Sequence, residues 1–241
     1  MVVRCDELYR RVAISVPSLA YTVAPGGGPR LPGSLLTDPE WLSAQVDASA
    51  RRWGGASRRV AGTLWWYSTS STLVAGPIVG LLVTGWVPAL DDVTFELAHG
   101  SVAGVRASRM LGRGPDVLAA AAGPALGAVI APLARVSGVG EGALRAVASD
   151  SVANRALDVA RGPAGEALAE RVAAVGGLPM PRFVEIPGAG PYLRRSSCCL
   201  IYAVPGAASP EVAKCASCPR QRPEVRERRM SGVAMGQRGP A

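Results

Sequence analysis

Four of the five cysteines lie close together late in the sequence, in a pattern that could bind a metal. Cys198 and Cys199 are adjacent, and Cys215 and Cys218 form a Cys-x-x-Cys pair. Thiolates are soft ligands, and four thiolates gathered at one place select zinc or iron–sulfur chemistry. The pattern therefore predicts a metal centre whose ligands are these four side chains.

The chemistry of the thiols leaves three alternatives open. Zinc favours two Cys-x-x-Cys-like pairs around one tetrahedral ion, and adjacent cysteines suit this geometry poorly because neighbouring side chains tend to diverge. A two-iron cluster offers two metal centres, so it accommodates divergent thiolates more easily. Free thiols are the third alternative. A disulfide framework is not expected, since the sequence starts without an apolar export signal and adjacent cysteines do not readily bridge each other.

The residues around the cysteines extend this pattern into a longer motif. Its parts are Arg194-Arg195-Ser196-Ser197-Cys198-Cys199-Leu200-Ile201-Tyr202, the turn Pro205-Gly206, and Cys215-Ala216-Ser217-Cys218. This motif resembles the C-terminal signature of the FhuF-like ferric-siderophore reductases. The fifteen-residue spacer Leu200–Lys214 is longer than the family pattern. Because a loop extension costs little closure entropy, we expect the ligand set to tolerate it.

The resemblance implies a (2Fe-2S)-binding protein in which Cys198, Cys199, Cys215 and Cys218 hold a [2Fe–2S] cluster. The implied activity is one-electron reduction of the Fe(III) held by an imported siderophore, a ferric-chelate oxidoreductase reaction of iron uptake. The implied partners are a ferric siderophore, a separate electron donor and, transiently, an inner-membrane importer. The implied location is the cytoplasm, with peripheral membrane association as an option. The alternative function is a zinc-stabilised binding or regulatory module without redox activity.

Three further side chains of the motif are candidates for tuning the cluster or binding substrate. Arg194 and Arg195 bring positive charge, which raises a cluster potential and attracts an anionic chelate. Tyr202 could pack over the cluster. For all three, ordinary surface or half-buried packing is an equally good explanation.

Outside the motif, few residues indicate chemistry. Trp65-Trp66-Tyr67 is the densest aromatic group, and core packing explains it better than a siderophore pocket. His99 is the only histidine, which argues against His-rich metal sites and a hydrolase triad. Cys5 is remote from the other cysteines. No GxGxxG or P-loop pattern occurs, so we expect no nucleotide or flavin site and infer that electrons come from a separate partner.

The composition is that of a folded chain with a basic end. Its 241 residues are 49% hydrophobic and 18% charged, with a net charge of +8. Residues 219–241 carry six arginines against two glutamates, a net charge of +4. No nucleic-acid-binding motif accompanies them, so we expect a disordered tail and no nucleic-acid partner.

The uncharged runs 62–90 and 117–134 could cross a membrane, but their glycines and prolines suit buried, bent helices equally well.

The elements that must position the cysteines are mainly helices. Apolar periodicity, capping residues and Gly/Pro breaks predict helices over about 39–53, from Ser57 onward, and over about 76–87, 115–136, 141–160 and 164–175. Residues 91–108 alternate as in a β-hairpin, and 179–191 is a Pro-rich linker. The predicted fold is mainly α: a helical domain with a small β-hairpin, then a compact C-terminal cysteine-ligated iron–sulfur segment. The expected boundaries are 1–178, 179–219 and 220–241.

Overall fold

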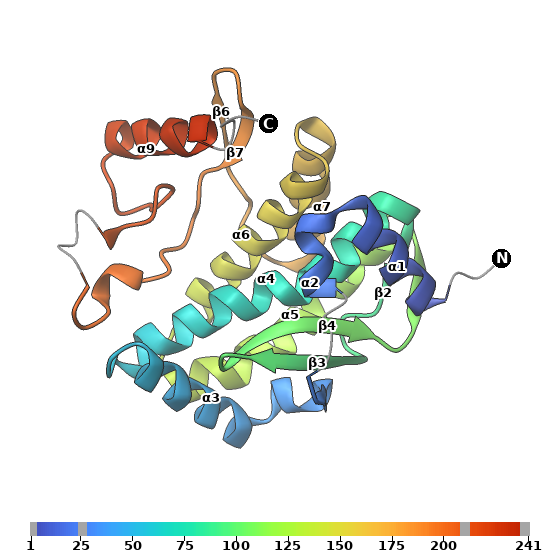
Figure 1. Ribbon diagram of the computed structural model, residues 1–241, viewed down its shortest axis with the longest axis horizontal. Helices are drawn as coiled ribbons and strands as arrows, with labels where there is room; N and C mark the ends of the chain where they lie inside the picture. Colours follow the sequence, from blue (N-terminus) through green and yellow to red (C-terminus); the bar gives the residue numbers. More distant parts are fainter. Residues whose placement is uncertain (1–3, 24–27, 208–212, 237–241) are drawn as a thin grey trace.

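The computed structural model describes residues 4–23, 28–207 and 213–236. It is mainly helical, as predicted from the sequence (Figure 1). The helices are α1 (Cys5–Ser15), α2 (Ala20–Val23), α3 (Pro39–Arg52), α4 (Arg58–Thr84), α5 (Pro115–Ser137), α6 (Glu141–Val159), α7 (Pro163–Gly176) and α9 (Pro223–Gly236), with 3-10 turns at Pro17–Leu19, Gly33–Thr37 and Ile201–Ala203. The strands are β1 (Arg30–Pro32), β2 (Trp86–Pro88), β3 (Val93–Ala98), β4 (Ser101–Ala107), β5 (Met110–Arg113), β6 (Phe183–Ile186) and β7 (Gly190–Leu193).

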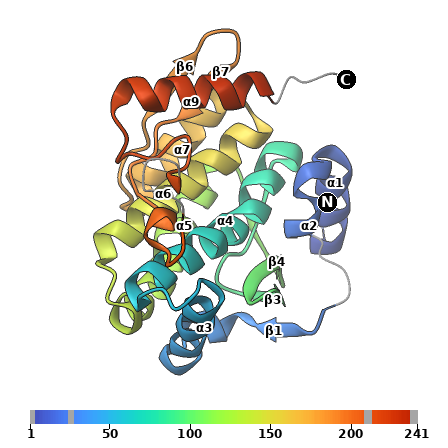
Figure 2. The same cartoon turned by 60° about the vertical axis from the view of Figure 1, so that its left-hand side comes forward.

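Helices α3, α5, α6 and α7 begin and end close to where the sequence predicts. Asp38 caps α3 by accepting hydrogen bonds from the backbone N–H groups of Glu40 and Trp41. The helices α5 and α7 start with a proline at the first position and end at a left-handed glycine, a common stop signal. Helix α4 packs against α3, α5 and α6, and α7 covers α5 and α6 (Figures 1 and 2).

The structure corrects the prediction of two separate helices within residues 57–87. Helix α4 continues through Pro77 as one 27-residue element, capped by the Ser57 side chain. Proline removes only one helical hydrogen bond, and burial on all sides compensates for it. The neighbouring glycines let α1 approach closely: a Cβ on Gly76 would lie 3.3 Å from the Tyr9 ring, and one on Gly80 would lie 3.2 Å from Leu8. Tertiary packing therefore overrides the local signal of the proline.

Helices α4 and α5 are long and apolar enough to cross a membrane by length and composition alone. Within this structure, 67% of the apolar window of α4 and 44% of that of α5 are buried. Helix α4 forms the centre of the core, with Trp65 and Trp66 fully buried.

The predicted β-hairpin is confirmed as β3 and β4, joined at His99-Gly100. It pairs antiparallel, with Phe95 opposite Val105, and β1 adds a third strand. His99 is exposed and has a φ of 51°, a left-handed conformation at the tip of the hairpin. The sheet packs on α4, so the hairpin turn lies near the end of α3 (Figure 1).

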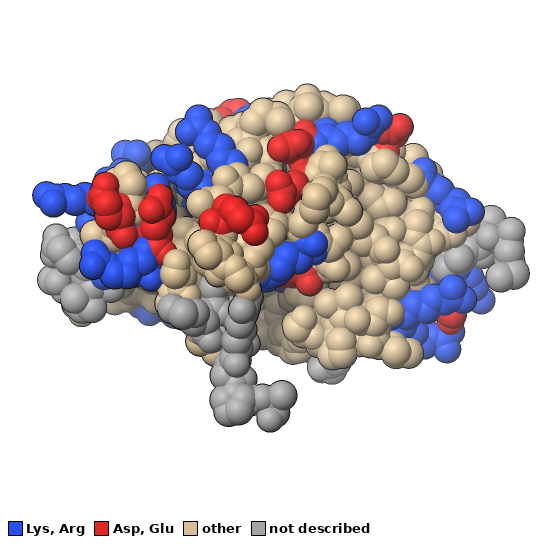
Figure 3. All heavy atoms as spheres, turned by 90° about the horizontal axis from the view of Figure 1, so that it is seen from above, with Lys and Arg blue, Asp and Glu red and all other residues tan. Residues whose placement is uncertain are grey.

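Two segments near the end of the described chain differ from the prediction. The Pro-rich linker 179–191 contains strand β6 and the start of β7, and the expected disordered tail contains helix α9. Burial of Met230 beside Ile186 and of Arg226 explains the helix, because α9 packs on the β6–β7 hairpin. Basic and acidic side chains mingle at this end of the molecule (Figure 3). The middle of the long spacer, residues 208–212, lies outside the described residues, and the domain boundaries remain predictions.

Candidate metal centre

The four motif cysteines lie near one another, and their sulfur atoms form two pairs. The Sγ atoms of Cys198 and Cys218 are 3.7 Å apart. Cys199 and Cys215 make the second pair through a hydrogen bond between their thiols. The neighbours Cys198 and Cys199 therefore point to different partners. This agrees with the expectation that the side chains of adjacent cysteines diverge.

This arrangement suits two metal ions better than one. Two thiolates on one tetrahedral metal, at about 2.3 Å each, lie roughly 3.8 Å apart, which agrees with the separation of Cys198 and Cys218. Within the described part of the chain, no three Cys, His, Asp or Glu side chains converge as ligands of a single ion. A [2Fe–2S] cluster takes two thiolates on each iron. The donor set of four thiolates therefore fits that group, which these side chains would hold.

The electrostatic environment of the thiols is uneven. The hydrogen bond from Cys215 lowers the pKa of Cys199 to about 5, with Arg195 acting in the same direction against burial. Donating that hydrogen bond raises the pKa of Cys215. Burial raises the pKa of Cys198 to about 11. Cys199 is therefore the thiol most readily held as the thiolate that metals require.

The loop that leads into the cysteines is fastened to α6 by Asp150. This carboxylate is fully buried and accepts hydrogen bonds from the backbone N–H of Ser196 (3.0 Å), the backbone N–H of Ser197 (3.1 Å) and the hydroxyl of Ser197 (2.7 Å). Its Oδ2 also lies 3.5 Å from Nε of Arg195. A buried carboxylate is stable only when it is paired and hydrogen-bonded, and this loop supplies both.

Arg195 connects Asp150 to the sulfur atoms. The side chain is buried, and its Nη1 lies 3.6 Å from Sγ of Cys215. Its guanidinium carbon lies 4.4 Å from the centre of the Tyr67 ring, a cation–π contact. Burial opposes the charge, but Tyr67, the two neighbouring thiols and Asp150 outweigh it and raise the pKa of Arg195. A permanent positive charge therefore lies beside the cysteines.

The backbone after each cysteine pair is also shaped for this site. Leu200 has a φ of 63°, a left-handed conformation that is unfavourable for leucine and turns the chain immediately after Cys199. In the second pair, the Cys218 N–H donates to the Cys215 carbonyl at 3.0 Å. Gln221 donates to that carbonyl at 2.6 Å and to the Ala216 carbonyl at 3.1 Å, which closes the Cys-x-x-Cys turn.

The other predicted site residues differ in where they lie relative to the four cysteines. Arg195 contacts the centre, whereas Arg194 is exposed, with its backbone N–H donating to the Arg182 carbonyl. Tyr202 lies against two cations, with Lys214 Nζ 5.7 Å and the Arg220 guanidinium 5.9 Å from its ring. Of the aromatic group, Trp65 and Trp66 belong to the core and only Tyr67 reaches the cysteines. Cys5 lies apart, beside Met110.

Asp150 is the site residue that sequence reasoning missed. It falls three positions after Val147, on the buried face of α6, and is flanked by the buried Ser149 and Ser151. An aspartate on an apolar helix face is almost always paired, and this is the signal that could have marked it. Its partners are more than forty residues further along the chain, so no local pattern identifies them.

The fold is mainly helical, and four cysteines gather near its C-terminal end as two sulfur pairs. Residues 195–220 match the FhuF 2Fe-2S C-terminal domain. This agrees with the resemblance seen in the sequence and identifies a [2Fe–2S] cluster as the cofactor, with Cys198, Cys199, Cys215 and Cys218 as the residues that would hold it. No curated protein matches the chain.

Proposed function

We propose that this protein is a ferric-siderophore reductase, which delivers one electron to Fe(III) bound in a siderophore and so releases Fe(II). The observation that carries the proposal is the match of residues 195–220 to the FhuF 2Fe-2S domain at two sulfur pairs that fit such a cluster. An FhuF-like 2Fe-2S domain suggests this activity.

The chemistry explains why one electron is sufficient. Hard oxygen chelators hold Fe(III) much more tightly than Fe(II), so reduction loosens the metal and leaves the chelator intact. A [2Fe–2S] cluster with only cysteine ligands, when bound, supplies an electron at low potential. Around it, Arg195 places a fixed positive charge beside Cys215. The apolar residues Ala56, Val60 and Leu64 pack around Cys199 and keep it buried.

The proposed setting follows from the same reaction. The chain would work in the cytoplasm, where an imported ferric siderophore becomes available, and would receive its electrons from a separate one-electron donor. A transient contact with an inner-membrane importer would shorten the path of the chelate. These partners and this location are part of the proposal, and we infer them from the FhuF-like 2Fe-2S domain.

The test begins with metal content. Protein purified without oxygen should be red-brown, contain two irons per chain, and give an electron paramagnetic resonance signal after reduction. The reduced protein should then be mixed with a ferric siderophore, with Fe(II) trapped by a ferrous-specific chelator. One Fe(II) should appear for each cluster reoxidised. Colourless protein with bound zinc and no iron would instead support the zinc-stabilised module and rule out the reductase.

A further inference from the structure

A cavity of about 570 Å³ lies directly against the second sulfur pair, Cys199 and Cys215. Its walls come from the end of α3, from α4, from the first residue of β4 and from the cysteine segment. Six of the lining side chains define its character: Arg52, Trp53, Tyr67, Ser68, Ser101 and Arg195. A ligand in this cavity would be in contact with Cys199 and Cys215.

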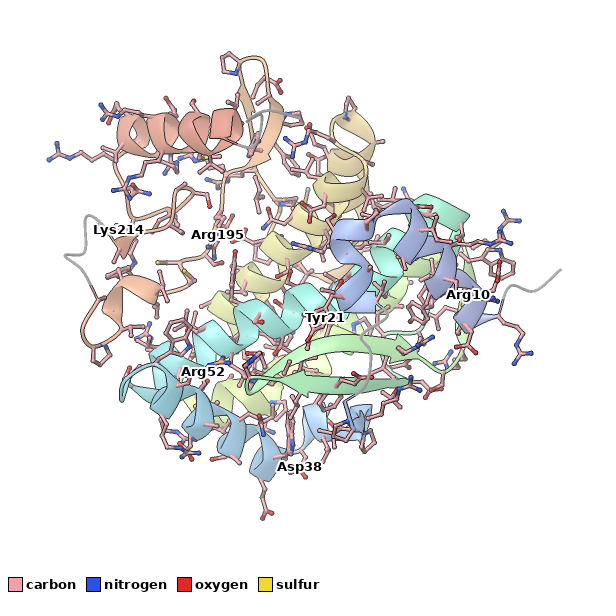
Figure 4. The ribbon with its side chains drawn as sticks, in the orientation of Figure 1. Arg10, Tyr21, Asp38, Arg52, Arg195 and Lys214 are labelled. Atoms are coloured by element: carbon pink, nitrogen blue, oxygen red, sulfur yellow. The ribbon has the colours of Figure 1, made fainter. Side chains whose placement is uncertain are left out.

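Among the residues that the structure describes, the lining is basic and aromatic and has no acidic side chain. Arg52 is fixed at the wall: it donates to the His99 carbonyl and, at 2.8 Å, to the Ser101 hydroxyl. Its guanidinium carbon also lies 5.9 Å from the centre of the Trp53 ring. Arg52 and Arg195 lie on the same half of the molecule, far from Arg10 on the opposite side (Figure 4). Both arginines therefore direct positive charge into one space.

Two lining residues carry buried donors that have no hydrogen-bond partner among the described residues. These donors are Nη2 of Arg195 and Nε1 of Trp53; both are buried and lack an acceptor within residues 4–23, 28–207 and 213–236, and Arg195 is 5% exposed. A buried N–H without an acceptor is destabilising, and such groups are uncommon in folded proteins. Both side chains line one cavity, so the acceptor oxygens of a bound ligand would lie near both donors.

We infer that this cavity is the binding site for an oxygen-donor ferric chelate. The anionic oxygens around the metal face Arg52 and Arg195, and the flat or apolar parts of the chelator pack on Trp53 and Tyr67. Tris-catecholates and tris-hydroxamates share this oxygen chemistry but differ in charge. The inference rests on the proposed function for the identity of the ligand, whereas the position of the site rests on the lining residues.

Gallium(III) complexes test the site without any electron transfer, because Ga(III) has the size and charge of Fe(III) and is not reduced. The gallium complexes of a tris-catecholate and of a tris-hydroxamate should be titrated into the cluster-loaded protein by calorimetry. We expect at least one complex to bind. The complex that binds more tightly shows whether the site prefers catecholate or hydroxamate oxygens. Absence of binding by both complexes overturns the inference.

Two variants locate the binding. Ser68→Phe fills the cavity from α4 and should weaken binding at least tenfold. Arg52→Gln should weaken binding several-fold, with a larger effect on the trianionic catecholate complex than on the neutral hydroxamate complex. Ala164→Phe, which enters a separate cavity of about 430 Å³, and Arg10→Ala, which removes an exposed charge, are the matched controls and should bind as the wild type does. The visible spectrum verifies that each variant retains its cluster.

The outcomes separate the site from the reaction. Binding that survives Ser68→Phe unchanged overturns the site, even in a protein that reduces ferric chelates. Binding that is lost in Ser68→Phe but kept in Ala164→Phe supports the site, even if the wild-type protein fails to reduce the bound iron. In that second case only the proposed reductase function fails.

Discussion

Asp150 and Arg195 form a buried ion pair, 3.5 Å between Oδ2 and Nε, that joins α6 to the cysteine loop. Asp150 is 0% exposed and Arg195 5% exposed, so neither charge can turn to water if the other is removed. The pair lies partly outside the matched FhuF segment, since only Arg195 falls within residues 195–220. The helical region therefore contributes directly to the metal centre.

Replacing Asp150 with Asn should destabilise the protein and loosen the centre. The change leaves the Arg195 charge buried without its counterion, which typically costs about 3–5 kcal/mol. Ser197→Ala is the milder variant. It removes only the 2.7 Å hydroxyl hydrogen bond and should cost roughly 1.5–3 kcal/mol, the range for hydrogen bonds to charged groups. Both variants should show a lower thermal midpoint and faster loss of iron to a chelator.

Asp158→Asn provides the control for the Asp150 variant on the same helix. Asp158 pairs with Arg155 at 3.0 Å but is 39% exposed, and such pairs contribute at most about 1 kcal/mol. Iron retention should match the wild type. If Asp150→Asn behaves like Asp158→Asn, the ion pair does not support the cysteine loop.

Arg195→Gln should lower the reduction potential of the cluster. Reduction adds negative charge, which a neighbouring cation stabilises, so removal of that cation disfavours the reduced state. A tenfold change in the one-electron equilibrium corresponds to about 59 mV, and we expect a decrease of roughly that size in a titration followed by electron paramagnetic resonance. Arg195→Lys keeps the charge and should shift the potential less.

Arg194→Gln is the matched control, because it removes the same charge from the adjacent but exposed position. Solvent screens an exposed charge, so its potential should stay near that of the wild type. Equal shifts in Arg194→Gln and Arg195→Gln would show that net charge, and not the buried contact with Cys215, sets the potential.

Local signals predicted that the four cysteines gather at one place, and they predicted most of the helices. The four cysteines needed only their spacing, and helices such as α3 and α7 are bounded by Asp38, Pro163 and Gly177, residues with strong conformational preferences. The expectation that Pro77 would mark the start of a separate helix was wrong. Packing of α4 against its neighbours outweighs the one hydrogen bond that the proline removes.

The remaining features depend on contacts between distant parts of the chain. Asp150 acquires its role only when Ser196 and Ser197 fold against it. Helix α9 is similar: its amphipathic pattern is weak, and burial of Met230 against the β6–β7 hairpin defines its inner face. A single sequence carries no record of such pairings, so neither was predicted.

Cys215→Ser should abolish the visible cluster spectrum. Serine oxygen is a harder and less acidic ligand than thiolate, and Cys215 is a member of the pair that also contacts Arg195. Cys5→Ser is the control, because Cys5 lies beside Met110 and away from the motif, and its iron content should be unchanged. An intact spectrum in Cys215→Ser would mean that the ligand set is assigned wrongly.

Gly123→Ala and Gly127→Ala should change stability in opposite directions, although both lie in α5. A Cβ on Gly123 would lie 2.7 Å from the Cα of Gly176, so α7 would have to move away, at a cost of roughly 1–3 kcal/mol. A Cβ on Gly127 meets only the end of the Arg145 side chain, at 3.7 Å. There alanine should stabilise the helix by about 0.5–1 kcal/mol. Thermal unfolding of the two variants measures both effects, and equal midpoints would contradict the close packing of α5 on α7.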